Sequence, residues 1–218
     1  MRLQSAIFDM DGTLLDSMAI WDNASSRALR ALGVEPRPDL RDRVHSLTLR
    51  EGAQYCKDAY GLPQTVEELV ALTKEQVREF YRTEVQAKPG VPEFLSLLKL
   101  EGVWMYVTTN TDRDLVEIAL EHTGLRDYFR GILTCAEVGA GKKDSPEIFE
   151  RAMRRLRSTK RDTVVFEDAL HAIRTAKAAG FRVCAVYDPS AEDEQEEIRA
   201  LADTYIRSFH EMFETRTR

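Results

Sequence analysis

Cysteine is scarce in this sequence, and its few cysteines follow no recognisable pattern. The 218 residues contain three, Cys56, Cys135 and Cys184, with no CxxC and no Cys/His spacing among them. A disulfide-stapled scaffold needs paired cysteines, and a structural zinc site needs closely spaced Cys or His ligands. The sequence therefore disfavours both, and we expect three reduced, buried thiols.

Long apolar runs and an excess of positive charge are also missing. No apolar stretch approaches the roughly 20 residues that cross a bilayer. The net charge is −6, from 31 Lys and Arg against 37 Asp and Glu, which disfavours nucleic acid or an anionic membrane as the partner. Asp9 and Asp11 interrupt the N-terminal segment before a signal-peptide core could form, so we expect a cytoplasmic protein.

Short apolar runs, rich in β-branched and aromatic residues, are abundant. Runs of this kind are typical of buried parallel strands. From about residue 89 onward they alternate with helical stretches, which predicts a doubly wound, Rossmann-like α/β sheet. Thr111 and Asp114 fit a capping box at the start of one of these helices. The expected strands are residues 5–8, 102–108, 131–135, 163–166, 182–187 and 204–206.

Residues 17–88 follow a different pattern and contain no convincing strand. Apolar residues recur there with a period near 3.6, and Thr48 and Thr65 each stand three residues before a glutamate, as in a capping box. This predicts an all-helical block inserted after the first strand. We expect an α/β core domain made of residues 1–16 and 89–218, and a helical cap domain of residues 17–88.

Two aspartates, Asp9 and Asp11, directly follow the first expected strand. Open α/β sheets bind ligands at the carboxyl ends of their strands. Two carboxylates spaced i, i+2 on a loop with a glycine can converge on one metal ion and one reacting atom. A plain turn is the alternative, since Asp and Gly both favour turns. The longer pattern of residues 8–17, FDMDGTLLDS, is more specific than the bare tetrad.

Four segments carry a resemblance to a known family: residues 8–17, 107–110 (VTTN), 143–149 (KDSPEIF) and 164–169 (VVFEDA). Their order and their places at strand ends and helix starts resemble the four motifs of the haloacid dehalogenase-like phosphatase superfamily. The resemblance covers essentially the whole chain. The helices inserted after the first motif resemble the subgroup with a C1-type helical cap. The resemblance thus implies the same fold as the pattern of strands and helices.

The resemblance also implies a phosphoric monoester hydrolase that uses Mg²⁺ and an aspartyl-phosphate intermediate. Asp9 would be the nucleophile, and Asp11 would protonate the leaving oxygen and then deprotonate water. Mg²⁺ takes oxygen ligands. The implied protein ligands are Asp9, the backbone carbonyl of Asp11, Asp168, and Glu167 directly or through water.

The phosphoryl group would be held by hydroxyl, backbone N–H and ammonium donors. The third motif departs from the usual glycine, lysine and proline, because Lys142 and Lys143 are followed by aspartate. Spacing to Pro146 selects Lys143, and Lys142 remains an alternative. The implied phosphate-binding residues are Thr108, Thr109, Asn110 and Lys143.

Two reactions remain open at this point: hydrolysis of a small phosphate monoester, and a β-phosphoglucomutase-like transfer on a phosphosugar. The resemblance places a histidine of those mutases at Trp21 here, which argues against the mutase reaction. We expect the cap to select the substrate, with Ser17, Trp21 and Arg50 as candidates, because a guanidinium such as that of Arg50 can clamp a second anionic group. The expected partner is a small phosphate ester, with neither nucleic acid nor membrane involved, and the expected state is a monomer.

Overall fold

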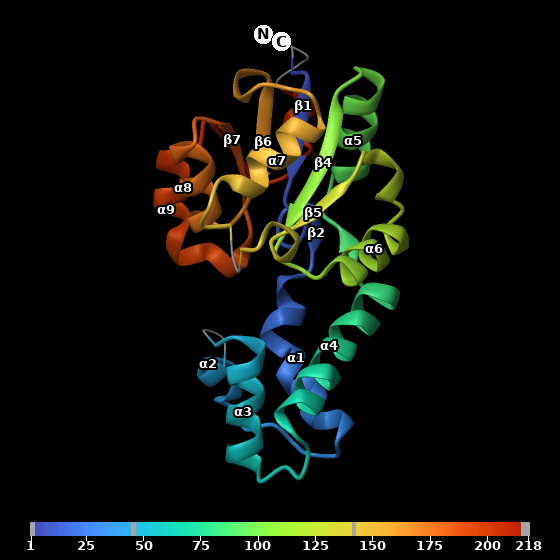
Figure 1. Cartoon of the computed structure of the whole chain (residues 1–218), viewed down its shortest axis with the longest axis vertical. Coiled ribbons are helices and arrows are strands. Elements are labelled where there is room, and N and C mark those ends of the chain that lie inside the picture. The colour runs from blue at the N-terminus through green and yellow to red at the C-terminus, as the bar shows by residue number, and fades with distance from the viewer. Residues whose placement is uncertain (1–2, 45–46, 141–142, 215–218) are drawn as a thin grey trace. The chain divides into compact units, whose positions relative to one another are not determined.

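The computed structural model describes residues 3–44, 47–140 and 143–214. The chain forms two compact units, one joining Met1–Asp16 to Val85–Arg218 and the other made of Ser17–Glu84. The first contains the large sheet and its helices, and the second is built from helices (Figure 1).

The first unit is built on a six-stranded parallel sheet with the strand order β5-β4-β1-β6-β7-β8 (Figure 1). Phe8 is in register with Val107 on one side and with Phe166 on the other. The residues that follow these three positions therefore meet at one edge of the sheet. All six expected strands are confirmed: β1 (Ser5–Phe8), β4 (Trp104–Thr109), β5 (Ile132–Thr134), β6 (Thr163–Glu167), β7 (Arg182–Val186) and β8 (Thr204–Ile206).

Helices follow the strands, as the alternating pattern predicts. The capping box expected from Thr111 and Asp114 is wrong. The helix begins at Arg113 with Asp112 at its N-cap, and the hydroxyl of Thr111 donates a hydrogen bond elsewhere. The helices are α5 (Val91–Leu100), α6 (Arg113–His122), α7 (Glu147–Arg155), α8 (Leu170–Ala178), α9 (Gln195–Leu201) and α10 (Glu211–Glu214).

Successive side chains of the central strands pack on opposite faces of the sheet. Ile7 belongs to a buried cluster with Phe149 of α7. Phe8 faces the other way, where its ring stacks on Phe166 with centroids 4.4 Å apart and meets Phe94 of α5 edge-on. Helices therefore cover both faces, which is the doubly wound arrangement, and the packed aromatic rings fix the ends of β1 and β6.

A short antiparallel pair, β2 (Leu15–Asp16) with β3 (Gln86–Ala87), lies where the chain leaves the first unit and returns to it. The N–H of Lys88 also donates to the carbonyl of Leu14 at 2.9 Å. These backbone bonds attach residues 85–88 to the first unit. The two compact units divide between residues 84 and 85, and the cap domain expected from the sequence extends four residues further, to residue 88.

The second unit packs four described helices around its own apolar core: α1 (Met18–Ala31), α2 (Leu40–Val44), α3 (Leu49–Tyr60) and α4 (Val66–Thr83). Both expected capping boxes are confirmed, since the hydroxyl oxygens of Thr48 and Thr65 each accept a hydrogen bond from the backbone N–H of the glutamate three residues on. The backbone N–H of each threonine in turn donates to the carboxylate of that glutamate. Leu29, Cys56 and Leu69 are buried in the core. Among the described residues, no helix combines the length and the apolar composition needed to cross a bilayer.

Candidate active site

The loop after β1 is a tight turn that exposes little of Asp9. The N–H of Asp9 donates to the carbonyl of Phe166 at 2.9 Å, and the N–H of Leu14 returns to the carbonyl of Met10 at 2.9 Å. Gly12 adopts φ +81°, a conformation that glycine adopts without the usual steric cost. The backbone conformation of the turn therefore explains why the motif has a glycine at position 12. The same turn leaves Asp9 buried at the sheet edge, with 7% of its surface exposed.

Three buried carboxylates converge at this edge. Asp9, Glu167 and Asp168 each offer an oxygen, and these oxygens all lie within 4.8 Å of one another. Thr13 donates to Oδ1 of Asp168 at 2.6 Å. Oε2 of Glu167 accepts from the N–H groups of Asp168 and Ala169 at 2.9 and 3.1 Å, which fixes its carboxyl group. Three oxygens held this close together form a donor set suited to a hard cation.

Lys143 is the cation that the chain itself places against these carboxylates. Its side chain is 2% exposed, and its Nζ contacts a carboxylate oxygen of Asp9 and, at 2.6 Å, Oε1 of Glu167. Lys142, the alternative lysine of the third motif, lies outside the described residues. The geometry thus brings Lys143 together with the first and fourth motifs.

Burial and neighbouring charges shift the pKa values of the carboxyl groups at this site. Burial, partly opposed by Lys143 and reinforced by Glu167, raises the pKa of Asp9 to about 7. Burial, with the nearby charges of Glu167 and Asp9, also raises the pKa of Asp168 well above its usual range. Burial works to lower the pKa of Lys143, but the charges of Asp9 and Glu167 outweigh it and raise that pKa. One ammonium therefore does not neutralise the cluster.

Thr108 presents an unused donor at the same edge. On β4, Thr108 directly follows Val107, and on the neighbouring segment Asp9 directly follows Phe8. Because Val107 and Phe8 are register partners, Thr108 lies beside the position of Asp9. The residue is fully buried, and its Oγ1 has no hydrogen-bond partner among the residues that the structure describes. Buried hydroxyl groups are normally hydrogen-bonded, so this one is available for an acceptor that enters the site.

Two side chains that the motif analysis missed support the loop after β4. The hydroxyl of Thr111 donates to Oδ2 of Asp11 at 2.7 Å. Cys135 donates from Sγ to Oδ1 of Asn110 at 2.8 Å, and burial raises the pKa of this thiol to about 11. As expected, all three cysteines are free and buried. No local pattern pointed to either contact, because both join segments that are distant in sequence.

A buried ion pair between Lys88 and Asp188 was also missed. Nζ of Lys88 lies 2.8 Å from Oδ2 of Asp188 and donates to the carbonyl of Tyr187 at 2.8 Å. Its charge works to lower the pKa of Asp168, although burial dominates there. The pair joins the segment after β3 to the end of β7, and so it fixes the return of the chain into the first unit.

The three cap candidates belong to the helical unit. Ser17 is buried directly before α1, and Trp21 is half-buried on that helix. Arg50 is exposed near the start of α3 and forms an ion pair with Glu67 at 2.7 Å. The structure therefore gives Arg50 a carboxylate partner within its own unit, while Ser17 and Trp21 remain candidates at the start of the first helix.

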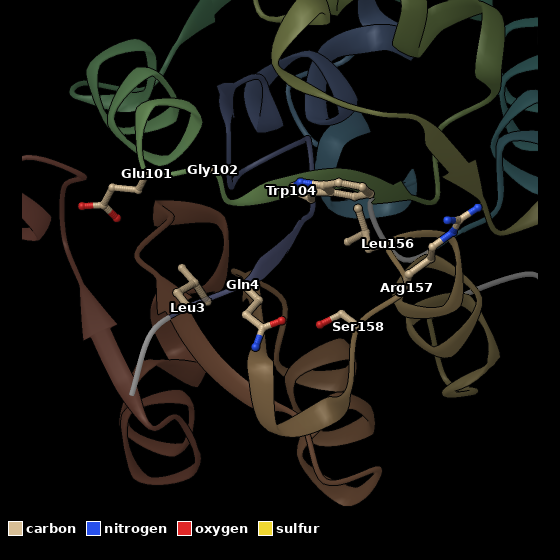
Figure 2. A pocket seen from close by; sticks show the side chains of 8 residues that line it. All are labelled: Leu3, Gln4, Glu101, Gly102, Trp104, Leu156, Arg157 and Ser158. Atoms are coloured by element: carbon tan, nitrogen blue, oxygen red, sulfur yellow. The ribbon is translucent and has the colours of Figure 1, made fainter.

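A separate cavity of about 470 Å³ opens at the opposite end of the sheet (Figure 2). Its lining includes Gln4 and Trp104, which stand at the amino ends of β1 and β4, with Leu156 and Ser158. Because the strands are parallel, this cavity lies away from the edge that carries Asp9. It is therefore not part of the carboxylate site.

Comparison with known proteins gives one family and a common fold. Residues 6–186 match the family model described as haloacid dehalogenase-like hydrolase. A phosphorylated carbohydrates phosphatase of Thermotoga maritima is 28% identical over 178 residues, which is 82% of each chain. Hexitol phosphatase B of Escherichia coli is 28% identical and covers 97% of this chain and 95% of its own.

Solved structures share the fold of this chain. A candidate beta-phosphoglucomutase from Thermotoga maritima has a TM-score of 0.83 at 26% identity, covering 93% of this chain and 94% of that one. The likeness confirms the expected fold class, and the family match confirms both the resemblance inferred from the four motifs and the expected hydrolase class. The chain belongs to the haloacid dehalogenase-like hydrolase family.

Proposed function

We propose that this hydrolase is a Mg²⁺-dependent phosphatase that cleaves a small phosphate monoester through an aspartyl-phosphate on Asp9. The observation that carries the proposal is the unpartnered, buried hydroxyl of Thr108 beside the position of Asp9. A phosphoryl group bound to Asp9 has equatorial oxygens that need donors, and Thr108 supplies one. The phosphatases among the relatives act on small phosphorylated compounds, as their names state.

The residues present fit a magnesium ion. Asp9, Glu167 and Asp168 bring oxygens within 4.8 Å of one another, and burial, reinforced by the charge of Glu167, raises the pKa of Asp9. A cation bound there would favour the ionised form of these buried carboxyl groups. Asp9, Asp168, the backbone carbonyl of Asp11, and Glu167 directly or through water would hold the ion. When bound, it would supply positive charge that offsets the charge of these carboxylates and of the substrate.

The first chemical step forms the phosphoenzyme. A carboxylate oxygen of Asp9 attacks phosphorus while the ester P–O bond breaks, and Asp11 gives its proton to the departing oxygen. Thr108, the N–H groups of Thr109 and Asn110, and the ammonium of Lys143 would bind the phosphoryl oxygens.

The second step releases phosphate. Asp11, now a carboxylate, takes a proton from water, whose oxygen attacks phosphorus as the bond to Asp9 breaks. Asp9 and Asp11 both return to their starting states, so the cycle balances as one ester and one water giving one alcohol and one phosphate.

The role of the helical unit is part of the same proposal. Its insertion between β2 and β3, the two short strands that pair in the first unit, supports a cap that selects the substrate. We propose that Ser17, directly before α1, and Trp21, on α1, make this selection. Arg50 is a weaker candidate because Glu67 engages its guanidinium.

A screen of phosphate esters tests the proposal. The protein is incubated with Mg²⁺ and sugar phosphates, nucleotides, phosphoglycolate and acyl phosphates, and free phosphate is measured, with Asp9→Asn as the matched control. The account predicts phosphate release that requires Mg²⁺ and Asp9. Full activity in Asp9→Asn would show that the nucleophile is assigned wrongly.

The mutase reaction is the second candidate, because the structure from Thermotoga maritima with a TM-score of 0.83 is described as a beta-phosphoglucomutase candidate. The same screen therefore includes β-glucose 1-phosphate with a bisphosphate primer. Formation of glucose 6-phosphate without release of phosphate would favour the mutase. Trp21, at the position where the resemblance places a histidine of those mutases, supports hydrolysis.

A further inference from the structure

We propose that Thr111 is a positioning residue that fixes the direction of the Asp11 carboxyl group. The inference rests on the proposed function, in which Asp11 gives and takes the proton of the reaction. It adds a residue that none of the four motifs contains.

The contact joins two loops that are far apart in the sequence. Oγ1 of Thr111 donates to Oδ2 of Asp11 at 2.7 Å, across 100 residues. Thr111 lies in the loop after β4, and Asp11 lies in the loop after β1. Only 7% of the surface of Thr111 is exposed. The bond is therefore held within the packed edge of the sheet, and its geometry is set by the two central strands.

The donor is itself anchored to the sheet. The backbone N–H of Thr111 donates to Oγ1 of Thr109 at 3.0 Å, and Thr109 is the buried last residue of β4. A chain of two hydrogen bonds thus runs from the strand end through Thr111 to Asp11. This chain ties the orientation of the carboxyl group to the buried end of a central strand of the sheet.

Helix capping, the usual use of such a threonine, does not account for the hydroxyl. A capping side chain accepts a hydrogen bond from a backbone N–H of the first helical turn. The helix α6 begins at Arg113 with Asp112 at the N-cap, and Thr111 donates its single hydroxyl proton to Asp11. The one proton that this hydroxyl can give is therefore directed at Asp11.

An acid that protonates a leaving group benefits from such a restraint. The terminal torsion of aspartate is broad and has no sharp rotamer of its own. Proton transfer, however, needs the carboxyl oxygen within hydrogen-bond reach of the reacting atom. A hydroxyl that holds Oδ2 narrows the rotation of the carboxyl plane. Loss of the hydroxyl should therefore slow the steps in which the proton matters and leave binding unchanged.

Aryl phosphates of differing leaving-group strength separate this role from a general structural one. 4-Nitrophenolate leaves without a proton, whereas phenolate needs one. In this two-step reaction kcat/KM reports only the first step, in which the leaving group departs. Thr111→Val should therefore lower kcat/KM about tenfold for phenyl phosphate, as for the loss of one useful hydrogen bond, and less than twofold for 4-nitrophenyl phosphate. Thr111→Ser keeps the hydroxyl and should restore kcat/KM for phenyl phosphate to within about twofold of the parent.

A matched control is Thr175→Val, which removes an exposed hydroxyl that donates to the carbonyl of His171 within α8. Thr175→Val should leave kcat/KM unchanged for both substrates. Equal losses of kcat/KM on both substrates in Thr111→Val, or no rescue by Thr111→Ser, would overturn the positioning role while leaving the proposed function intact. A parent protein that turns over neither substrate in an Asp9-dependent reaction would instead overturn the proposed function, and the role of Thr111 with it.

Discussion

The hydroxyl of Thr13 donates a 2.6 Å hydrogen bond to Oδ1 of Asp168, a residue 155 positions further along the chain. Both side chains are buried. The bond joins the loop after β1 to the end of β6, and it orients one of the carboxylates proposed to hold the metal ion. Thr13, a residue within the first motif, therefore has a structural reason to carry a hydroxyl.

Removing this hydroxyl should weaken metal binding. Hydrogen bonds that orient a ligand typically contribute a factor of about 10 to 100 in metal affinity. Thr13→Val should raise the dissociation constant for Mg²⁺ by about that factor, and Thr13→Ser should raise it by much less. Titration calorimetry of the metal-free protein measures both. Equal affinities in the parent and in Thr13→Val would show that the hydrogen bond does not orient a ligand.

Replacing Lys143 should destabilise the protein in a pH-dependent way. The ammonium is buried between Asp9 and Glu167, so Lys143→Met leaves buried carboxylates without their cation. Breaking a buried pair in this way costs about 3–5 kcal/mol. We expect a loss of this order in the free energy of unfolding at pH about 8, measured by urea denaturation in EDTA, and a smaller loss at pH about 5, where the carboxyl groups can take up protons.

The matched control for Lys143→Met is Lys177→Met. That variant breaks an exposed pair with Asp203, and exposed pairs contribute about 0–1 kcal/mol. Similar losses for the two variants would contradict the account of Lys143.

The metal-free protein should lose stability as the pH rises. Burial raises the folded-state pKa of Asp9 from 3.8 to about 7. A carboxyl group with a raised pKa favours the folded state when protonated, so its contribution is complete below pH about 4 and is lost as the pH rises through about 7. Asp168 shifts in the same direction. We expect the free energy of unfolding in EDTA to fall across this window, and Mg²⁺ to restore it at neutral pH.

The variant Asp9→Asn cannot ionise at this position, so its stability should depend less on pH across the same window. If the free energy of unfolding of the parent in EDTA rises between pH about 4 and 7, and Asp9→Asn follows the same curve, the raised pKa assigned to Asp9 is contradicted.

The sequence predicted the features that depend on local patterns. Short apolar runs located all six strands of the parallel sheet. Because parallel strands end at a common edge, the motifs after β1, β4 and β6 could be placed together before any coordinates were known. The register of Phe8 with Val107 and Phe166 explains why this inference succeeded.

The sequence could not predict contacts set by side-chain direction between distant segments. Thr111 carries a helix-capping pattern, yet its hydroxyl donates to Asp11. The Lys88–Asp188 pair spans 100 residues with no local signal at either end. The strand β3, directly after the helical unit, was also not predicted, because two residues are too few to leave a periodic pattern.

Changing Asp11 should separate the two halves of the reaction. With 4-nitrophenyl phosphate the first step needs no proton donor, while the second still needs a base to activate water. Asp11→Asn should therefore release a burst of about one nitrophenol per enzyme. Its steady-state turnover should then be slower than that of the parent by a factor of about 10² or more. Stopped-flow absorbance measures both phases.

The control for this burst is Asp193→Asn, an exposed aspartate that lies outside the site, and it should behave as the parent does. A slow first phase in Asp11→Asn, with no burst, would argue against the division of roles between Asp9 and Asp11.

The central claim is that Asp9 becomes phosphorylated during turnover. The direct measurement is a rapid acid quench of the protein with 4-nitrophenyl phosphate carrying labelled phosphorus, followed by peptide mapping. The account predicts an acid-stable, alkali-labile phosphoryl group on the peptide that contains Asp9, and none in Asp9→Asn. Rapid release of phosphate with no label on Asp9 at any quench time, or an equal label in Asp9→Asn, would contradict it.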